Sequence, residues 1–184
     1  MNFLIRPAVL TDIPRLTDIY REAVLNGTAT YELDPPSEAD MGHRLAAITR
    51  QGYPFIVAQK EDGDVAGYAY ANAFRTRPAY RWLVEDSLYL APEARGQGIG
   101  KALLQDLLVL CTTLGFRQMV AVIGGASAAS IAVHRSCGFE HSGVMTATGF
   151  KFGQWLDTVL MQKALGEGAA SAPDMSAYPA TMPD

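Results

Sequence analysis

The sequence predicts an α/β (α+β) domain in which helices cover a mixed β-sheet. Short β-type runs alternate with segments whose apolar residues recur at helical spacing, in the order β-α-α-β-β-β-α-β-α-β-β. Hydrophobic residues make up 49% of the chain and charged residues 18%, which is typical of a folded protein with a core. A length of 184 residues fits one domain.

The first part of the chain predicts one strand and two helices. Residues 2–6 alternate weakly and indicate a strand. Thr11 is the candidate N-cap of a helix with a single apolar stripe, and Gly27 ends that helix. Two prolines make residues 28–36 a loop or a short strand. Ser37 is the candidate N-cap of the second helix.

A block of β-type segments follows, and two helices interrupt it. Gly63 in the EDGD turn suits a tight hairpin. An arginine-rich loop, RTRPAYRW, occupies residues 75–82. The expected strands span 55–59, 65–74, 84–90, 119–123, 140–148 and 155–163, and the expected helices span 99–115 and 128–136. The last two strands form a hairpin that turns around residues 149–153.

Composition excludes several classes of protein. The net charge of −4 and the absence of a Lys/Arg cluster argue against a nucleic-acid partner. No apolar run is long enough for a membrane span, and the N-terminus lacks a signal-peptide layout, so we expect a cytoplasmic protein. Cys111 and Cys137 cannot form a disulfide scaffold, and no Cys/His cluster predicts a metal. We expect a domain over 1–165 and a disordered tail over 166–184, which is rich in Ala, Gly, Ser and Pro.

The most informative segment is the glycine-rich loop between a predicted strand and a predicted helix. It consists of Arg95, Gly96, Gln97, Gly98, Ile99 and Gly100, and Lys101 follows. Three glycines in five positions let the backbone wrap closely around a ligand, and the free N–H groups of the helix start favour a diphosphate. The dinucleotide GxGxxG and P-loop GxxxxGK[ST] patterns are both absent. A glycine-rich turn without a ligand remains the alternative.

The motif Arg95-x-x-Gly98-x-Gly100 resembles the acyl-CoA-binding motif of the GNAT N-acetyltransferase superfamily. A second motif of that superfamily, NxxAxxLYxxxGF, resembles the segment from Ser127 to Phe139. Serine replaces the usual asparagine at position 127. The resemblance covers residues 2–163 and implies a GNAT fold whose central strands splay apart at the acetyl-CoA site.

Within that superfamily the chain looks most like the phosphinothricin / methionine sulfoximine acetyltransferase group. The segments that carry this likeness are 84–90 (VEDSLYL), 132–134 (AVH) and 151–157 (KFGQWLD). The resemblance implies acetyl transfer from acetyl-CoA to the α-amino group of a small amino-acid-like substrate, and a homodimer. The residues it implies for the cofactor are Leu88, Tyr89, Leu90, Arg95, Gly96, Gln97, Gly98, Ile99, Gly100, Lys101, Ser127 and Ser130.

Two side chains are candidates for the proton transfers. Glu85 lies on the strand before the glycine-rich loop, and a partly dry cleft would raise its pKa and make it a suitable base for the amine. The alternative is a solvated carboxylate. Asp86 is expected on the opposite strand face, so only one of the two carboxylates should face the cleft. His134 stands where many relatives have a tyrosine acid, and it is either an acid, an orienting group or a packed helix-end residue.

The arginine-rich loop is the candidate substrate site. A guanidinium fork suits a carboxylate or phosphinate, and aromatic rings suit the apolar part of a substrate. The candidates are Phe74, Arg75, Thr76, Arg77 and Tyr80, together with Glu85 as the base. An exposed basic loop is the alternative.

Residues elsewhere are weaker candidates. Tyr31 and Glu32 border the predicted pocket. For Phe152 and Trp155 the resemblance implies a hairpin that closes the cleft and helps to form a dimer, and the alternative is a place in the core. Cys137 follows His134 by three residues, but no third group orients a nucleophile, and a buried thiol is favoured.

Two other functions remain open at this stage. A GNAT protein of this kind acts either on a different amine, such as a protein N-terminus or a polyamine, or as an acyl-CoA sensor without catalysis. Small amino acids as substrates are favoured by the arginine pair, which would repel a polyamine.

Overall fold

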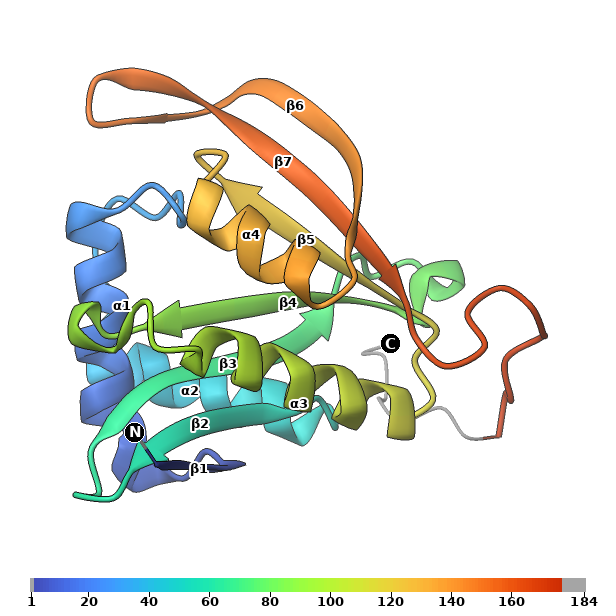
Figure 1. Cartoon of the computed structure of the whole chain (residues 1–184), viewed down its shortest axis with the longest axis horizontal. Helices are drawn as coiled ribbons and strands as arrows, with labels where there is room; N and C mark the ends of the chain where they lie inside the picture. Colours follow the sequence, from blue (N-terminus) through green and yellow to red (C-terminus); the bar gives the residue numbers. More distant parts are fainter. Residues whose placement is uncertain (1, 177–184) are drawn as a thin grey trace.

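The computed structural model describes residues 2–176, which form four α-helices, three short 3-10 helices and seven strands in the predicted order (Figure 1). The elements are β1 (Phe3–Pro7), η1 (Leu10–Asp12), α1 (Ile13–Asn26), α2 (Glu38–Arg50), β2 (Phe55–Lys60), β3 (Val65–Ala73), η2 (Pro78–Tyr80), β4 (Leu83–Leu90), η3 (Pro92–Ala94), α3 (Ile99–Thr113), β5 (Gln118–Gly124), α4 (Ala128–Ser136), β6 (Glu140–Lys151) and β7 (Gln154–Ala164).

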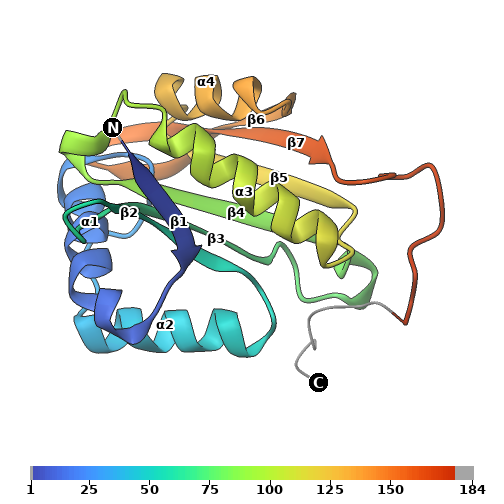
Figure 2. The same ribbon diagram turned by 60° about the horizontal axis from the view of Figure 1, so that its bottom comes forward.

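The seven strands form one mixed sheet in the order β1-β2-β3-β4-β5-β7-β6. Every neighbouring pair is antiparallel except β4 and β5, which are parallel. Helices α1 and α2 cover one face of the sheet, and α3 and α4 cover the other (Figure 2). The fold class expected from the sequence is therefore confirmed.

Two buried helix stripes close the core on the two faces of the sheet. On α1 the buried apolar side chains are Leu16, Ile19, Tyr20 and Val24. On α3 they are Ile99, Leu103, Leu104, Leu107, Leu108 and Cys111. Both sets follow the three-or-four-residue spacing of one helical face, so burial of that face against the sheet explains why each segment is helical.

The expected N-cap of α2 is confirmed, whereas that of α1 is displaced by one residue. Ser37 Oγ accepts from Asp40 N at 3.1 Å, and the Asp40 carboxylate accepts from Ser37 N at 3.1 Å. Thr11 lies inside η1, and Asp12 is the N-cap of α1. The Asp12 carboxylate is engaged elsewhere, because Arg6 donates to both of its oxygens at 2.8 Å.

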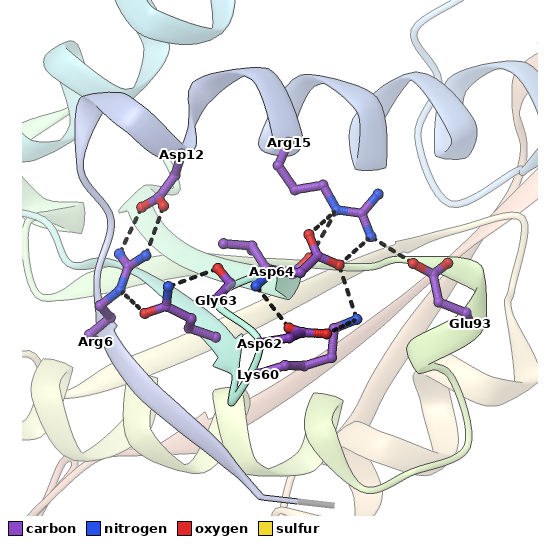
Figure 3. A network of polar contacts seen from close by, with 10 residues as sticks. Arg6, Asp12, Arg15, Lys60, Asp62, Gly63, Asp64 and Glu93 are labelled. Carbon is purple, nitrogen blue, oxygen red and sulfur yellow. Dashed lines mark hydrogen bonds and ion pairs between the residues drawn. The ribbon is translucent and has the colours of Figure 1, made fainter.

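A polar network attaches the start of the glycine-rich loop to the body of the domain (Figure 3). Arg15 of α1 donates to Val65 O at 3.1 Å and forms an ion pair with Asp64 in the β2–β3 turn at 3.1 Å. The same guanidinium pairs with Glu93 of η3 at 2.6 Å. Because η3 directly precedes the loop, these contacts fix where the loop leaves β4.

The last hairpin is longer than predicted. Pairing continues through Phe150–Trp155 and Lys151–Gln154, so the turn comprises only Phe152 and Gly153 instead of a turn around residues 149–153. Both turn residues have positive φ, as a two-residue hairpin turn of this kind requires. The ladder hydrogen bonds outweigh the loop preference of the glycine at position 149.

The other irregular segments are loops. Residues 28–36 contain no strand, which resolves the alternative left open by the sequence. After β7, residues 165–176 form turns, and the Arg117 guanidinium donates to Ser171 Oγ at 2.7 Å and Ala172 O at 2.9 Å. The predicted disordered tail at 166–184 includes residues 177–184, which lie outside the described residues.

No helix within residues 2–176 combines the length and the apolar character that crossing a bilayer would need.

Candidate active site

A cavity of about 230 Å³ opens where β4 and β5 separate. The two strands pair only from Leu83–Gln118 to Asp86–Ala121, and beyond that point they diverge (Figure 1). The lining residues come from the α1–α2 loop, β4, β5, α4 and β7. They are Ala29, Thr30, Tyr31, Glu85, Asp86, Ser87, Leu88, Tyr89, Ala121, Val122, Ile123, Gly124, Ser130, His134 and Thr158.

Glu85 lies in the wall of this cavity on the α1 side of the sheet. Tyr89, four residues further along β4, shares its strand face and packs against Tyr20 of α1 with ring centroids 4.9 Å apart. Burial, and secondarily the charge of Asp86, raises the pKa of Glu85 to about 7, whereas the charge of Arg75 lowers it. A carboxyl group with this pKa exchanges protons readily near neutral pH.

The expectation that only one of the two adjacent carboxylates faces the cleft is wrong. Asp86 points to the other face of β4, toward α4, yet it also lines the cavity. The cavity lies in the gap between two separated strands, so it reaches both faces of the sheet. A prediction from strand alternation alone assumes a continuous sheet.

Both ring nitrogens of His134 already have partners. Nε2 lies 2.9 Å from Asp86 Oδ2, and Nδ1 lies 2.7 Å from the backbone oxygen of Ser130. The ring also meets Phe139 edge-on at 5.0 Å. Burial lowers the pKa of His134, but the hydrogen bond and the charge of Asp86 together raise it above the usual value. The imidazole therefore lines the cavity with its orientation fixed by these two hydrogen bonds.

The glycine-rich loop ends in a helix start that has no side-chain cap. Gly98 is the N-cap of α3 with a φ of 81°, a left-handed conformation that disfavours any side chain. A Cβ at Gly96 or Gly98 would meet no atom within 4 Å, so the space beside the loop is open. The uncapped N–H groups of α3 and the open cradle together fit the diphosphate of a coenzyme.

The side chains of this loop have separate roles. Arg95 forms an ion pair with Glu22 of α1, and Gln97 donates to the backbone oxygen of Glu93. Ile99 is buried in the core, so only its backbone is available to a ligand. Lys101 is exposed at the first turn of α3.

The remaining cofactor candidates lie on β4 and α4. Leu88 and Tyr89 line the cavity, whereas Leu90 packs near Gly67 and Gly100. Ser127 is the N-cap of α4 and accepts from Ser130 N at 3.4 Å. The Ser127 hydroxyl thus caps this helix.

The arginine-rich loop does not line the cavity. The rings of Phe74 and Tyr80 meet edge-on at 6.0 Å, and the Arg75 guanidinium lies 4.5 Å from the centroid of Phe74. Thr76 and Arg77 are exposed. The loop follows β3 directly, and Arg75 is near enough for its charge to lower the pKa of Glu85, so the loop borders the site.

Tyr31 is the most connected of the weaker candidates. Its hydroxyl lies 2.7 Å from Thr158 Oγ1 and accepts from Gly125 N at 3.2 Å. The ring lies so close to Gly124 that a Cβ there would be 3.1 Å from it. The α1–α2 loop is thereby fixed against β5 and β7. The sequence analysis predicted the strand at 119–123 but did not identify its residues or Thr158 as part of the site, because it assumed a continuous sheet.

Several other candidates lie outside the cavity. Glu32 pairs with Arg44 at 2.9 Å. Cys137 is buried, with Sγ 3.9 Å from Lys101 O, as the favoured alternative predicted. Phe152 and Trp155 are 58% and 66% exposed, so assigning them to the core is wrong.

Comparison with known proteins finds the same family that the two sequence motifs resemble. The model of the acetyltransferase (GNAT) family matches residues 14–139. A phosphinothricin N-acetyltransferase from Alcaligenes faecalis is 44% identical over 164 residues, which cover 89% of this chain and 83% of that protein. An L-methionine sulfoximine/L-methionine sulfone acetyltransferase from Pseudomonas aeruginosa is 41% identical over 94% of this chain and 100% of its own length.

A solved structure is closer still. The crystal structure of a GNAT superfamily phosphinothricin acetyltransferase from Sinorhizobium meliloti, in complex with AcCoA, matches with a TM-score of 0.96. It is 62% identical and covers 99% of this chain and 98% of that one. These likenesses confirm the resemblance that the two sequence motifs indicated.

The raised pKa of Glu85 predicts a pH-dependent gain in stability for Glu85→Gln. The folded state holds the Glu85 proton up to a pH of about 7, whereas the unfolded chain releases it near 4.5. The free energy of unfolding of the wild type therefore falls as pH rises between these values. Relative to wild type, the variant should gain about 1–3 kcal/mol on going from about pH 4.5 to about pH 8.

Urea unfolding of both proteins at the two pH values measures this difference. Glu140→Gln, the loss of an exposed carboxylate on β6, is the matched control for charge. An equal stability difference between Glu85→Gln and wild type at both pH values would contradict the burial of Glu85.

Proposed function

We propose a substrate and residue roles on one premise: the chain belongs to the acetyltransferase (GNAT) family and is an acetyltransferase that uses acetyl-CoA. The substrate is the α-amino group of a small amino-acid-like molecule of the phosphinothricin, methionine sulfoximine or methionine sulfone type. The names of the two relatives described above support this substrate class. Transfer is direct, within a complex that holds both substrates.

The observation that carries the proposal is a carboxyl group with a pKa of about 7 in the cavity between β4 and β5. An amine attacks a thioester only as the free base, so a group must accept its proton. Glu85 accepts that proton, directly or through a water, while the new N–C bond forms and the S–C bond breaks. The thiolate leaves with the electron pair, and His134 acts on the acetyl region as an acid or an orienting group.

The chain holds acetyl-CoA mainly through backbone groups. The N–H groups from Gly96 to Lys101 bind the diphosphate, and Lys101 and Arg95 add positive charge. The main chain of Leu88–Leu90, whose ladder to β5 has ended, binds the pantetheine arm. Ser127 and Ser130 at the start of α4 face the same ligand. Acetyl-CoA supplies the activated acetyl group when bound.

The arginine-rich loop orients the amino-acid substrate. Arg75 and Arg77 pair with its carboxylate or phosphinate, because a guanidinium fork matches two oxygens. Phe74, Thr76 and Tyr80 complete the wall beside the apolar part of the substrate.

A panel of amines tests the proposal. Methionine sulfoximine, methionine sulfone and phosphinothricin should release CoA thiol with acetyl-CoA, whereas polyamines and peptide N-termini should not. Release only with peptides or polyamines would favour the rival acetyltransferase. Saturable acetyl-CoA binding without thiol release for any amine would instead indicate a sensor, and no binding heat in calorimetry would remove the proposal altogether.

Replacing the proposed base separates chemistry from binding. Glu85→Gln should lower kcat by about 10²–10⁴, the usual contribution of a general base. The Kd for acetyl-CoA, measured by calorimetry, should stay within about threefold, because backbone groups hold the coenzyme. An unchanged kcat would exclude Glu85 as the base.

The proposal also includes a cytoplasmic homodimer. The β6–β7 hairpin exposes Val144, Met145, Phe150, Phe152 and Trp155, and the rings of Phe150 and Trp155 pack together at 5.2 Å. A cluster of exposed apolar side chains of this kind favours an interface.

Sedimentation equilibrium tests the dimer. The wild type should sediment as a dimer, and Trp155→Asp should shift the protein to monomers at the same concentration. Val109→Asp, a change at an exposed apolar residue of α3, is the matched control and should leave the dimer intact. A monomeric wild type would refute this part of the proposal.

A further inference from the structure

The proposed function gives no role to Asp86, although Asp86 forms a buried pair of ionisable groups with His134 between β4 and α4. The side chains of His134 and Asp86 are only 4% and 2% exposed, and Nε2 and Oδ2 lie 2.9 Å apart. One member comes from each of the two elements that flank the cavity. Burial of two ionisable groups costs free energy unless they compensate each other closely.

The hydrogen bond to Ser130 determines where one proton of the His134 ring lies. A carbonyl oxygen accepts only, so the 2.7 Å contact with Ser130 O requires a proton on Nδ1 of His134. Asp86 Oδ1 is buried and has no hydrogen-bond partner among the described residues. With Nδ1 protonated, Nε2 either donates to an ionised Asp86 carboxylate or accepts from a protonated one. Burial lowers the pKa of His134, but the hydrogen bond and the charge of Asp86 raise it above the usual value, which favours donation from Nε2. A ring with both nitrogens protonated is an imidazolium.

Side chains from α3, β4 and β5 surround this pair. Facing it from α3 is Cys111, whose thiol stays neutral because burial raises its pKa to about 12. Glu85 adjoins Asp86 on β4, and β5 contributes Ala121, Val122 and Ile123 to the same cavity. The carboxylate charge of Asp86 also contributes to the raised pKa of Glu85.

We propose that Asp86 is a positioning residue for acetyl transfer, because its carboxylate holds His134 in the cavity wall as an imidazolium of fixed orientation. This inference rests on the proposed function and deepens it. It selects the orienting role for His134: both N–H groups are committed to protein acceptors, so the ring acts through its positive charge and no proton leaves it. That charge favours the negative charge that develops on the thioester oxygen and sulfur.

The protonation state is measured directly in the free enzyme. Nitrogen-15 NMR of the imidazole rings, with His134→Gln to assign the signal, should show His134 doubly protonated at neutral pH. In Asp86→Asn the same ring should become neutral and titrate below the ordinary value of about 6.5, because burial is then uncompensated. Asp106→Asn, at an exposed position of α3, is the matched control and should leave the His134 titration unchanged.

Two outcomes of this measurement overturn the inference. A neutral His134 in the wild type at neutral pH does so without any variant, so misfolding of Asp86→Asn cannot conceal it. An unchanged titration in a folded Asp86→Asn does so as well. Asp86→Glu keeps the charge and should restore double protonation at least in part.

Kinetics then connect the pair to the reaction. Asp86→Asn should lower kcat by about 10–10²-fold, less than the loss of a general base, while KM for acetyl-CoA changes by less than about threefold. The high-pH limb of its pH–rate profile should move to lower pH, because the imidazolium is lost earlier. An unchanged kcat and profile in an active enzyme would refute the inference. A wild type that acetylates no amine would instead refute the proposed function and leave the NMR result standing.

Discussion

The early end of the pairing between β4 and β5 is the constraint on which the site depends. Strand β4 keeps its ladder to β3 as far as Leu90, but its ladder to β5 stops at Asp86. Backbone groups along one side of β4 are then available to a ligand, since buried N–H and C=O groups require partners. The α1–α2 loop supports the separation, because the Tyr31 hydroxyl contacts Thr158 of β7 and Gly125, which directly follows β5.

The same gap explains the unusual charge arrangement. In a continuous sheet, Glu85 and Asp86 would belong to separate environments on opposite faces. Here one cavity reaches both, so a carboxyl group with a raised pKa lies beside an Asp86 carboxyl whose Oδ2 is 2.9 Å from His134 Nε2. Folding around such groups costs free energy, which the apolar stripes of α1 and α3 offset. Buried groups with shifted pKa values are typical of catalytic sites.

The sites proposed for the coenzyme and for the substrate offer different kinds of contact. The glycine-rich loop, which is the proposed coenzyme site, offers backbone groups, and the Arg15–Glu93 ion pair fixes the start of this loop. The arginine-rich loop is exposed and joined to β3 at one end, so its side chains can vary without disturbing the sheet. Chemistry is therefore more strongly determined by this fold than the identity of the amine.

The sequence by itself determined the order of elements, the Ser37 cap, the glycine-rich loop and Glu85 as a candidate, because these depend on local spacing and backbone conformation. The place where two strands stop pairing depends on contacts between distant segments, such as Tyr31 with Thr158. Only the tertiary structure therefore brought Asp86 to His134, whose positions are 48 residues apart, and placed Phe152 and Trp155 on the surface. Strand periodicity specifies which face of the sheet a side chain occupies, but it does not specify where pairing with the neighbouring strand ends.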